Sequence, residues 1–130
     1  KLIKARLFME IPPAEIIDRM SIVQLKVERI GNEESKIELD ILKKEIENFR
    51  NKGMEIKNEW LEELYNINKE EWDLLGEMNE EREKNKDLSK IVELYLRTEQ
   101  VNKKRAQAKN KIVEETGIGF KEIKKNHPSA

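Results

Sequence analysis

The 130-residue sequence contains no cysteine, which excludes disulfides, thiolate zinc sites and cysteine nucleophiles. Its one histidine, His127, stands beside Pro128 near the end of the chain, and no Ser–Asp constellation accompanies it as a catalytic base would require. No apolar run approaches the ~20 residues of a membrane span, and no signal-peptide pattern occurs. We therefore expect a cytoplasmic protein that has no membrane partner.

The sequence also has no large net charge, because it contains 26 basic and 27 acidic residues and its net charge is −1. Binding to nucleic acid or to a membrane surface needs a concentrated positive field, so the composition argues against both. The basic segment 102–111 has no interleaved aromatic residues, and acidic residues surround it. Charged residues at 41% and hydrophobic ones at 37% are instead typical of long amphipathic helices.

Only three prolines occur, and nothing between Pro13 and Pro128 forbids helix. Apolar periodicity and the glycines that end it predict four helices, at 13–30, 33–51, 56–85 and from Asp87 or Ser89 to 116. Short turns between them favour one all-α domain, an antiparallel helical bundle. Residues 1–12 are predicted to form an extended N-terminal arm, and residues 117–130 a tail that is loosely held from Phe120 onward.

Two features of this plan predict a homodimer or higher oligomer. The arm, if it forms a strand, needs a partner strand, which a second copy of the chain would supply. The helix at 13–30 is apolar on two faces, since Ile16, Met20 and Val23 lie on one and Ile22 and Leu25 on another. Such a helix is central in its fold or shared with a partner subunit.

Polar residues interrupt the inward-facing stripes of the last two helices. Counted in heptads from Ile91, the inward-facing positions of the last helix include Thr98 and Arg105. In the third helix Asn68 and Glu71 also take inward-facing positions. Reflecting residue numbers through the turn near Lys86 sets Asn68 opposite Arg105 and Glu71 opposite Asn102. We therefore expect these side chains to meet at one level, with Glu71 as the carboxylate that holds Arg105.

Two interpretations of this polar level remain open. It is either a buried ion-pair layer that fixes helix register or a binding site for an anion, in which guanidinium groups contact phosphate or carboxylate and a ring stacks on a base. In the second interpretation Tyr65 is an alternative to Trp72 as the flat wall. The candidate ligand-binding residues are Arg19, Lys26, Arg29, Asn68, Glu71, Trp72, Asn102, Arg105 and Lys109.

Pairs of carboxylates three residues apart resemble the ligand pairs of helical metalloenzymes, as in Glu59/Glu62, Glu70/Asp73, Glu77/Glu80 and Glu80/Glu83. With so many acidic residues, such pairs arise by chance on solvated helix faces, and no second acidic pair is placed downstream on another helix. Gly117-x-Gly119 lacks the strand–turn–helix context of a phosphate loop. We therefore predict no metal and no cofactor.

Three segments resemble an uncharacterised family of small helical proteins from bacteria and phages. Residues 14–30, AEIIDRMSIVQLKVERI, are similar to the family's Gly-Glu-Leu-Ile-Asp-Lys-Ile-Thr-Ile-Leu-Glu-Ile-Lys run. INKEEW at 67–72 resembles its Ile-Asn-x-x-x-Trp, and VNKKRAQAKNKI at 101–112 its Asn-x-x-Arg-Ala-x-x-Lys-x-x-Ile. The family tends to have an acidic pair shortly after the tryptophan, where this chain has Leu75-Gly76. The resemblance implies relatives rather than a reaction, but its motifs contain Asn68, Trp72, Asn102 and Arg105.

That overlap tips the sequence-based hypothesis toward a binding site. The leading prediction is non-catalytic binding of a small anionic ligand, a nucleotide or phosphorylated metabolite, with sequestration of a nucleotide signal if the chain is phage-encoded. The first alternative is a structural or protein-interaction bundle whose polar layer sets register and oligomerisation. The second is a metal-dependent all-α phosphohydrolase.

Overall fold

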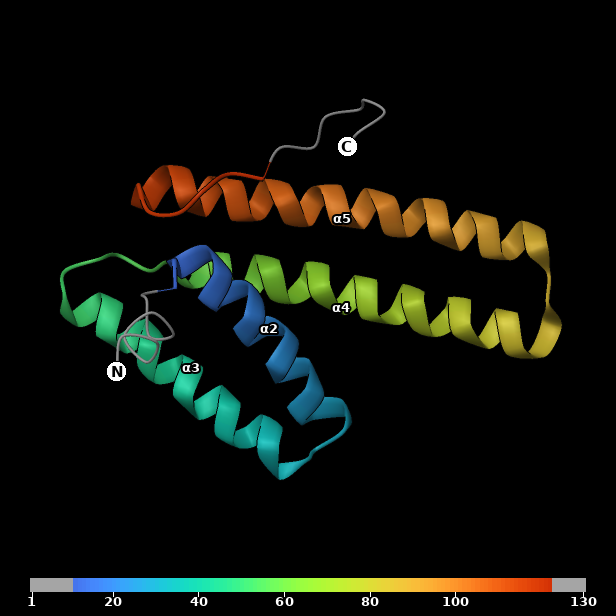
Figure 1. Ribbon diagram of the computed structural model, residues 1–130, viewed down its shortest axis with the longest axis horizontal. Helices are drawn as coiled ribbons and strands as arrows, with labels where there is room; N and C mark the ends of the chain where they lie inside the picture. The colour runs from blue at the N-terminus through green and yellow to red at the C-terminus, as the bar shows by residue number, and fades with distance from the viewer. Residues whose placement is uncertain (1–10, 123–130) are drawn as a thin grey trace, which may run out of the picture.

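The computed structural model of the protein describes residues 11–122 and confirms the predicted all-α bundle (Figure 1). No strand occurs among those residues. Residues 1–10, which hold most of the predicted arm, lie outside the described part. The helices are α2 (Pro13–Arg29), α3 (Glu33–Asn51), α4 (Asn58–Glu80) and α5 (Leu88–Thr116), and a short π-helical turn, η1 (Glu81–Asn85), follows α4.

Local sequence signals explain where the helices begin and end. Pro13 opens α2 in the first turn, where its missing N–H is not needed. Asp87 caps α5 by accepting a hydrogen bond from the backbone N–H of Lys90, at 3.3 Å. Gly117 ends α5 in the left-handed conformation, with φ of 72°, and its N–H donates to the carbonyl of Val113. These three ends follow from capping chemistry, whereas the helix predicted at 56–85 begins at Asn58 and changes to the η1 turn after Glu80.

The four helices form two hairpins of unequal length. In Figure 1 the long antiparallel pair α4–α5 runs along the molecule, and the shorter pair α2–α3 lies obliquely across one end of it. Helix α2 packs against α3, α4 and α5, whereas α3 makes its helix–helix contacts with α2. We call the end of α4–α5 that α2 covers the near half, and the end toward η1 the far half. Placement of α2 at the centre follows from its two apolar faces.

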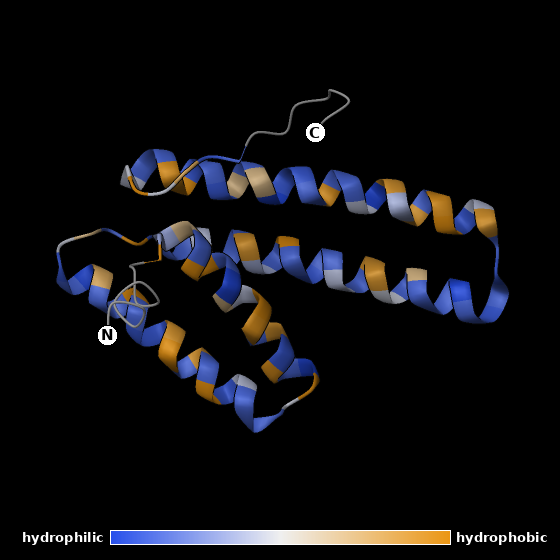
Figure 2. Cartoon of the chain, in the orientation of Figure 1, coloured by the Kyte–Doolittle hydropathy of each residue, from blue (hydrophilic) through white to orange (hydrophobic). Residues whose placement is uncertain are grey.

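Two clusters of buried side chains make up the core. The larger joins all four helices in the near half, and its apolar stripes are visible in Figure 2. The smaller lies between α4 and α5 alone. Fully buried members of the two clusters include Ile17, Val23, Leu64 and Ile112 in the first and Leu94 in the second. The near half therefore holds most of the buried apolar surface that stabilises the fold.

None of the helices described within residues 11–122 combines the length and the apolar character that crossing a bilayer requires.

Candidate functional site

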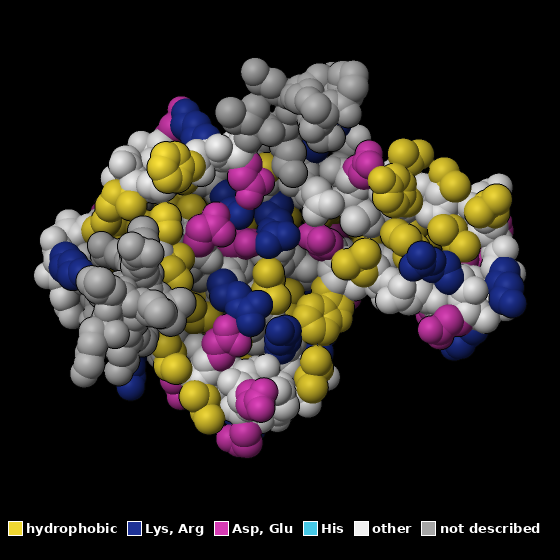
Figure 3. All heavy atoms as spheres, viewed as in Figure 1, with side chains coloured by type: hydrophobic (Ala, Val, Ile, Leu, Met, Phe, Trp, Pro, Cys, Tyr) yellow, Lys and Arg dark blue, Asp and Glu magenta, His cyan; other side chains and the backbone are white. Residues whose placement is uncertain are grey.

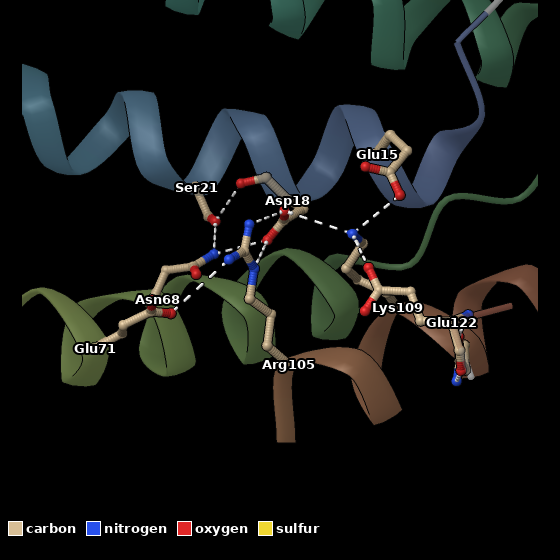
Figure 4. Close-up of polar contacts among 9 residues, drawn as sticks. Glu15, Asp18, Ser21, Asn68, Glu71, Arg105, Lys109 and Glu122 are labelled. Atoms are coloured by element: carbon tan, nitrogen blue, oxygen red, sulfur yellow. Dashed lines mark hydrogen bonds and ion pairs between the residues drawn. The ribbon is translucent and has the colours of Figure 1, made fainter. Parts of the chain in front are cut away.

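A buried carboxylate, Asp18 of α2, is the centre of the polar level between the two hairpins (Figure 4). Arg105 of α5 binds it with two N–H groups, Nε to Oδ1 at 2.9 Å and Nη2 to Oδ2 at 2.5 Å. The side chain of Asp18 is 6% exposed and that of Arg105 is 29% exposed. The hydrogen bonds to Asp18 raise the pKa of Arg105 above its usual value, although burial opposes the rise. This is the paired, two-pronged geometry that guanidinium and carboxylate groups favour.

Two neutral side chains complete the coordination of Asp18. The Asn68 amide nitrogen donates to Asp18 Oδ1 at 3.0 Å and to Ser21 Oγ at 2.6 Å. The Ser21 hydroxyl in turn donates to the backbone carbonyl of Asp18, at 2.7 Å. Both Ser21 and Asn68 are almost fully buried. Helices α2, α4 and α5 are therefore joined by one hydrogen-bonded set.

Lys109 extends the set toward the end of the described chain. Its Nζ lies 2.8 Å from Glu122 Oε1, 3.0 Å from Glu15 Oε1 and 3.9 Å from Asp18 Oδ2. Burial lowers the pKa of Lys109, but the hydrogen bonds to Glu122 and Glu15 raise the pKa by a larger amount, so the net shift is upward. The Glu122 backbone also exchanges two hydrogen bonds with the Asn110 side chain. Of the segment predicted to be loosely held, residues 120–122 lie in the described part, and these contacts tie Glu122 to α5.

The predicted meeting of polar side chains from α4 and α5 is present in the structure, but its chemistry differs from the prediction. Glu71 Oε2 lies 3.9 Å from Arg105 Nη1, and Asn102, with its amide nitrogen turned toward Glu71, donates to that carboxylate at 3.2 Å. The main partner of Arg105 is Asp18 and not Glu71. Asp18 takes that role because it lies on the face of α2 that packs directly against α4 and α5.

Arg29 and Trp72 lie beside each other, and Arg29 is held there by a carboxylate of α4. Arg29 forms an ion pair with Asp73, and its guanidinium lies 5.9 Å from the centre of the Trp72 ring. The hydrogen bond to Asp73 is the main reason that the pKa of Arg29 is raised. Tyr65, the alternative wall, donates to Glu28 at 2.5 Å.

Arg19 and Lys26 are not brought to Arg105. Arg19 makes a two-pronged contact with Glu38 of α3, at 2.7 and 3.1 Å. The pKa of Glu38 is lowered chiefly by its hydrogen bond to Arg19, and the nearby charge of Lys26 adds to the effect. Arg19 therefore joins α2 to α3, and Lys26, two helical turns further along α2, lies on the same side of the helix. The prediction that Arg19 and Lys26 lie with Arg105 in one group of site residues is therefore wrong.

The cluster as a whole is formally acidic rather than cationic, because its carboxylates outnumber its cations. Two cations, Arg105 and Lys109, are surrounded by the four carboxylates of Glu15, Asp18, Glu71 and Glu122. Among the described residues, no buried side-chain nitrogen or oxygen lacks a hydrogen-bond partner. No group of three or more His, Asp or Glu side chains within residues 11–122 is placed to hold a metal ion. The buried atoms of the polar level are therefore all hydrogen-bonded within the chain.

A small cavity of about 150 Å³ borders the network. Its lining is largely apolar, and Trp72 and Arg105 are among the residues that form its walls. The lining residues are Ile22, Leu25, Asn68, Glu71, Trp72, Leu75 and Arg105. Ligand pockets commonly measure about 300–1,000 Å³, so this cavity is too small to enclose a nucleotide.

Sequence reasoning missed four members of the network: Glu15, Asp18, Ser21 and Glu122. A signal existed for two of them, because Asp18 and Ser21 stand one turn apart among Ile16, Ile17 and Ile22. No family model, curated protein or solved structure matches the chain.

Proposed function

We propose that this chain is a non-catalytic protein-interaction bundle, in which the Asp18 network fixes how the α2–α3 hairpin docks on the α4–α5 hairpin. The observation that carries the proposal is the complete pairing of Asp18 by groups of its own chain, Asn68 from α4 and Arg105 and Lys109 from α5. A polar group at a core position is best attested in the role of specifying register.

The network favours one docking arrangement because the alternatives leave charges unpaired. Sliding α2 along α4–α5 by one helical turn, about 5.4 Å, would move Asp18 away from Arg105 and Asn68 and toward apolar neighbours. An unpaired buried carboxylate is strongly destabilising, by several kcal/mol. Apolar contacts between the hairpins are far less selective, since the hydrophobic effect has no preferred direction. The polar residues therefore supply specificity and the apolar residues supply most of the stability.

Anion binding is the second candidate, and one observation favours it. The Arg105 guanidinium group is partly exposed and borders the same cavity as the Trp72 ring. The size of the cavity restricts an anion there to something like inorganic phosphate or a small carboxylate, and it would compete with Asp18 and Glu71 for Arg105. Sequestration of a nucleotide signal, cytoplasmic location and kinship with the bacterial and phage family stay predictions.

Thermal unfolding of the full chain and of Arg105→Met, with and without millimolar inorganic phosphate or ATP, separates the two functions. If the network is structural, the substitution lowers the unfolding midpoint by the same amount in every buffer, and neither anion raises the wild-type midpoint beyond chloride at equal ionic strength. A saturable rise that follows RT ln(1 + [L]/Kd) and disappears in Arg105→Met would contradict the proposal and support a ligand site. Hydrolysis of ATP that depends on added divalent metal would establish an enzyme instead.

A further inference from the structure

Helix α5 is apolar on two sides in the far half of the molecule. One side packs on α4 through the buried residues Leu94 and Val101. The other side is open, and its residues recur at the i, i+4, i+7, i+8 spacing of a helix face. We call this open side the α5 stripe: Leu88, 73% exposed; Val92, 49%; Tyr95, 53%; and Leu96, 55%.

The stripe continues a side of α5 that is buried elsewhere. Leu88 and Ala106 are 18 residues apart, which is five complete turns, so both project from the same side of the helix. Ala106 is 4% exposed in the near half, whereas Leu88 in the far half is largely open. Figure 3 shows hydrophobic side chains gathered over the far half of the long hairpin. On this side of α5, half-buried Asn102 and exposed Glu99 lie between Ala106 and the stripe, so the cover ends before the stripe begins.

The far half also has little core of its own. Residues 79–93, which include η1 and the start of α5, contain no buried side chain. Two helices without a third element to pack on are marginally stable in water, because most helical stability comes from tertiary packing. In the near half α2 supplies that element. The far half also needs a third element to pack on, and no element of the described chain supplies one there.

We propose that the α5 stripe is the contact surface for a second copy of this chain, packed so that the two far halves form one four-helix arrangement about a two-fold axis. This inference rests on the proposed function and specifies the partner. In an antiparallel α5–α5 contact with the axis at Val92, Leu88 of one copy meets Leu96 of the other, and the reverse holds as two-fold symmetry requires. Four helices at small crossing angles are the common way to bury such faces.

The exposed area agrees with what a stable dimer needs. Weighted by their exposed fractions, the four stripe residues leave roughly 500 Å² of surface open on each copy. A standard interface buries about 800 Å² per partner, of which roughly 57%, or about 450 Å², is non-polar. The four stripe residues therefore offer more than half of the total area that a standard interface buries on each partner, and the polar residues beside them supply the rim.

The other exposed isoleucines do not make a comparable surface. Ile37 and Ile41 of α3 are 59% and 55% exposed, but Glu34, Lys44 and Glu45 share their side of the helix. Isolated apolar residues among charges are ordinary on protein surfaces. The stripe is different because Leu88, Val92 and Leu96 are three successive apolar positions at i, i+4 and i+8, whereas Glu45 takes the third position after Ile37 and Ile41. Ile37 therefore provides a matched control position.

Sedimentation equilibrium of the full chain tests the proposal with Leu88→Lys, Leu96→Glu and the control Ile37→Glu. The wild type is expected to form dimers at micromolar concentration. Each stripe substitution should raise the dimer Kd at least about tenfold, because it occurs twice in a two-fold interface, and Ile37→Glu should leave the Kd unchanged. Circular dichroism should show the same helicity in all four chains.

Mixing the two stripe variants gives the sharpest result. A heterodimer of Leu88→Lys with Leu96→Glu places lysine against glutamate at one contact and leaves leucine against leucine at the other, so mixing should restore association. A monomeric wild type, failure of the mixture to associate, or equal weakening by Ile37→Glu would each overturn the proposal. None of these outcomes touches the role of the Asp18 network, which fails separately if Arg105→Met leaves the stability of the chain unchanged.

Discussion

Replacing Arg105 with methionine removes both charged hydrogen bonds to Asp18 while keeping an unbranched side chain of similar length. Breaking a fully buried ion pair by removing one partner costs about 3–5 kcal/mol, because the other charge stays buried and unpaired. Two features of the site reduce that figure. The Arg105 side chain is 29% exposed, and Asp18 keeps the hydrogen bond from Asn68 at 3.0 Å. We therefore expect Arg105→Met to lower the free energy of unfolding by about 2–3 kcal/mol.

The loss should be measured by urea unfolding at neutral pH and by the thermal midpoint. For a chain of 130 residues it corresponds to a fall of roughly 6–12 °C in the midpoint. Arg19→Met is the matched control, because Arg19 also grips a carboxylate with two N–H groups. Both members of this pair are open to solvent, since the side chains of Arg19 and Glu38 are 48% and 37% exposed, and such pairs contribute about 0–1 kcal/mol. Equal losses in the two variants, or no loss in Arg105→Met, would refute the reasoning.

Three further predictions concern single residues. Burial lowers the pKa of Lys109, but its hydrogen bonds raise the pKa by more, so the stability that Lys109 contributes is present below the ordinary pKa of 10.5 and is lost as pH rises through the raised pKa. Urea unfolding above pH 10.5 should therefore show a shallower decline of stability with pH in Lys109→Met than in the wild type. Parallel declines in the two chains would contradict this. Trp60→Phe deletes the 3.1 Å hydrogen bond to Glu115 and part of a buried ring, so the free energy of unfolding should fall in the same assay; an unchanged value would show that neither the bond nor the lost ring packing contributes. Lys86 adopts a left-handed conformation with φ of 55°, which glycine adopts at lower cost. Lys86→Gly should therefore raise the free energy of unfolding by roughly 0.5–1 kcal/mol and raise the thermal midpoint with it. A lowered midpoint would be inconsistent with backbone strain at Lys86.

Much of this fold can be read from the sequence because its signals are local. Pro13, Asp87 and Gly117 set helix ends through caps and backbone conformation, which depend on a few neighbouring residues. The level at which Asn68 meets Arg105 also follows from counting, since a short turn fixes the register of an antiparallel helix pair. These parts needed no knowledge of how the hairpins pack on each other.

The rest of the site depends on tertiary placement. In the sequence Arg19 and Arg105 are equivalent candidates, and only the crossing of the two hairpins decides that one lies toward α3 and the other toward Asp18. Asp18 is likewise an ordinary polar residue of α2 until that crossing buries it against α4 and α5. Glu122 joins Lys109 because the chain turns back along α5 after Gly117. No local pattern encodes that return.

The most direct test of the Asp18 network is the double-mutant cycle formed by Asp18→Asn, Arg105→Met and their combination, followed by urea unfolding with the fluorescence of Trp60 and Trp72. If the two side chains jointly fix the docking of the hairpins, the loss in the double variant is smaller than the sum of the single losses by about 2 kcal/mol or more. Losses that add within about 0.5 kcal/mol would show that the two residues act independently and would contradict the central role given to their contact.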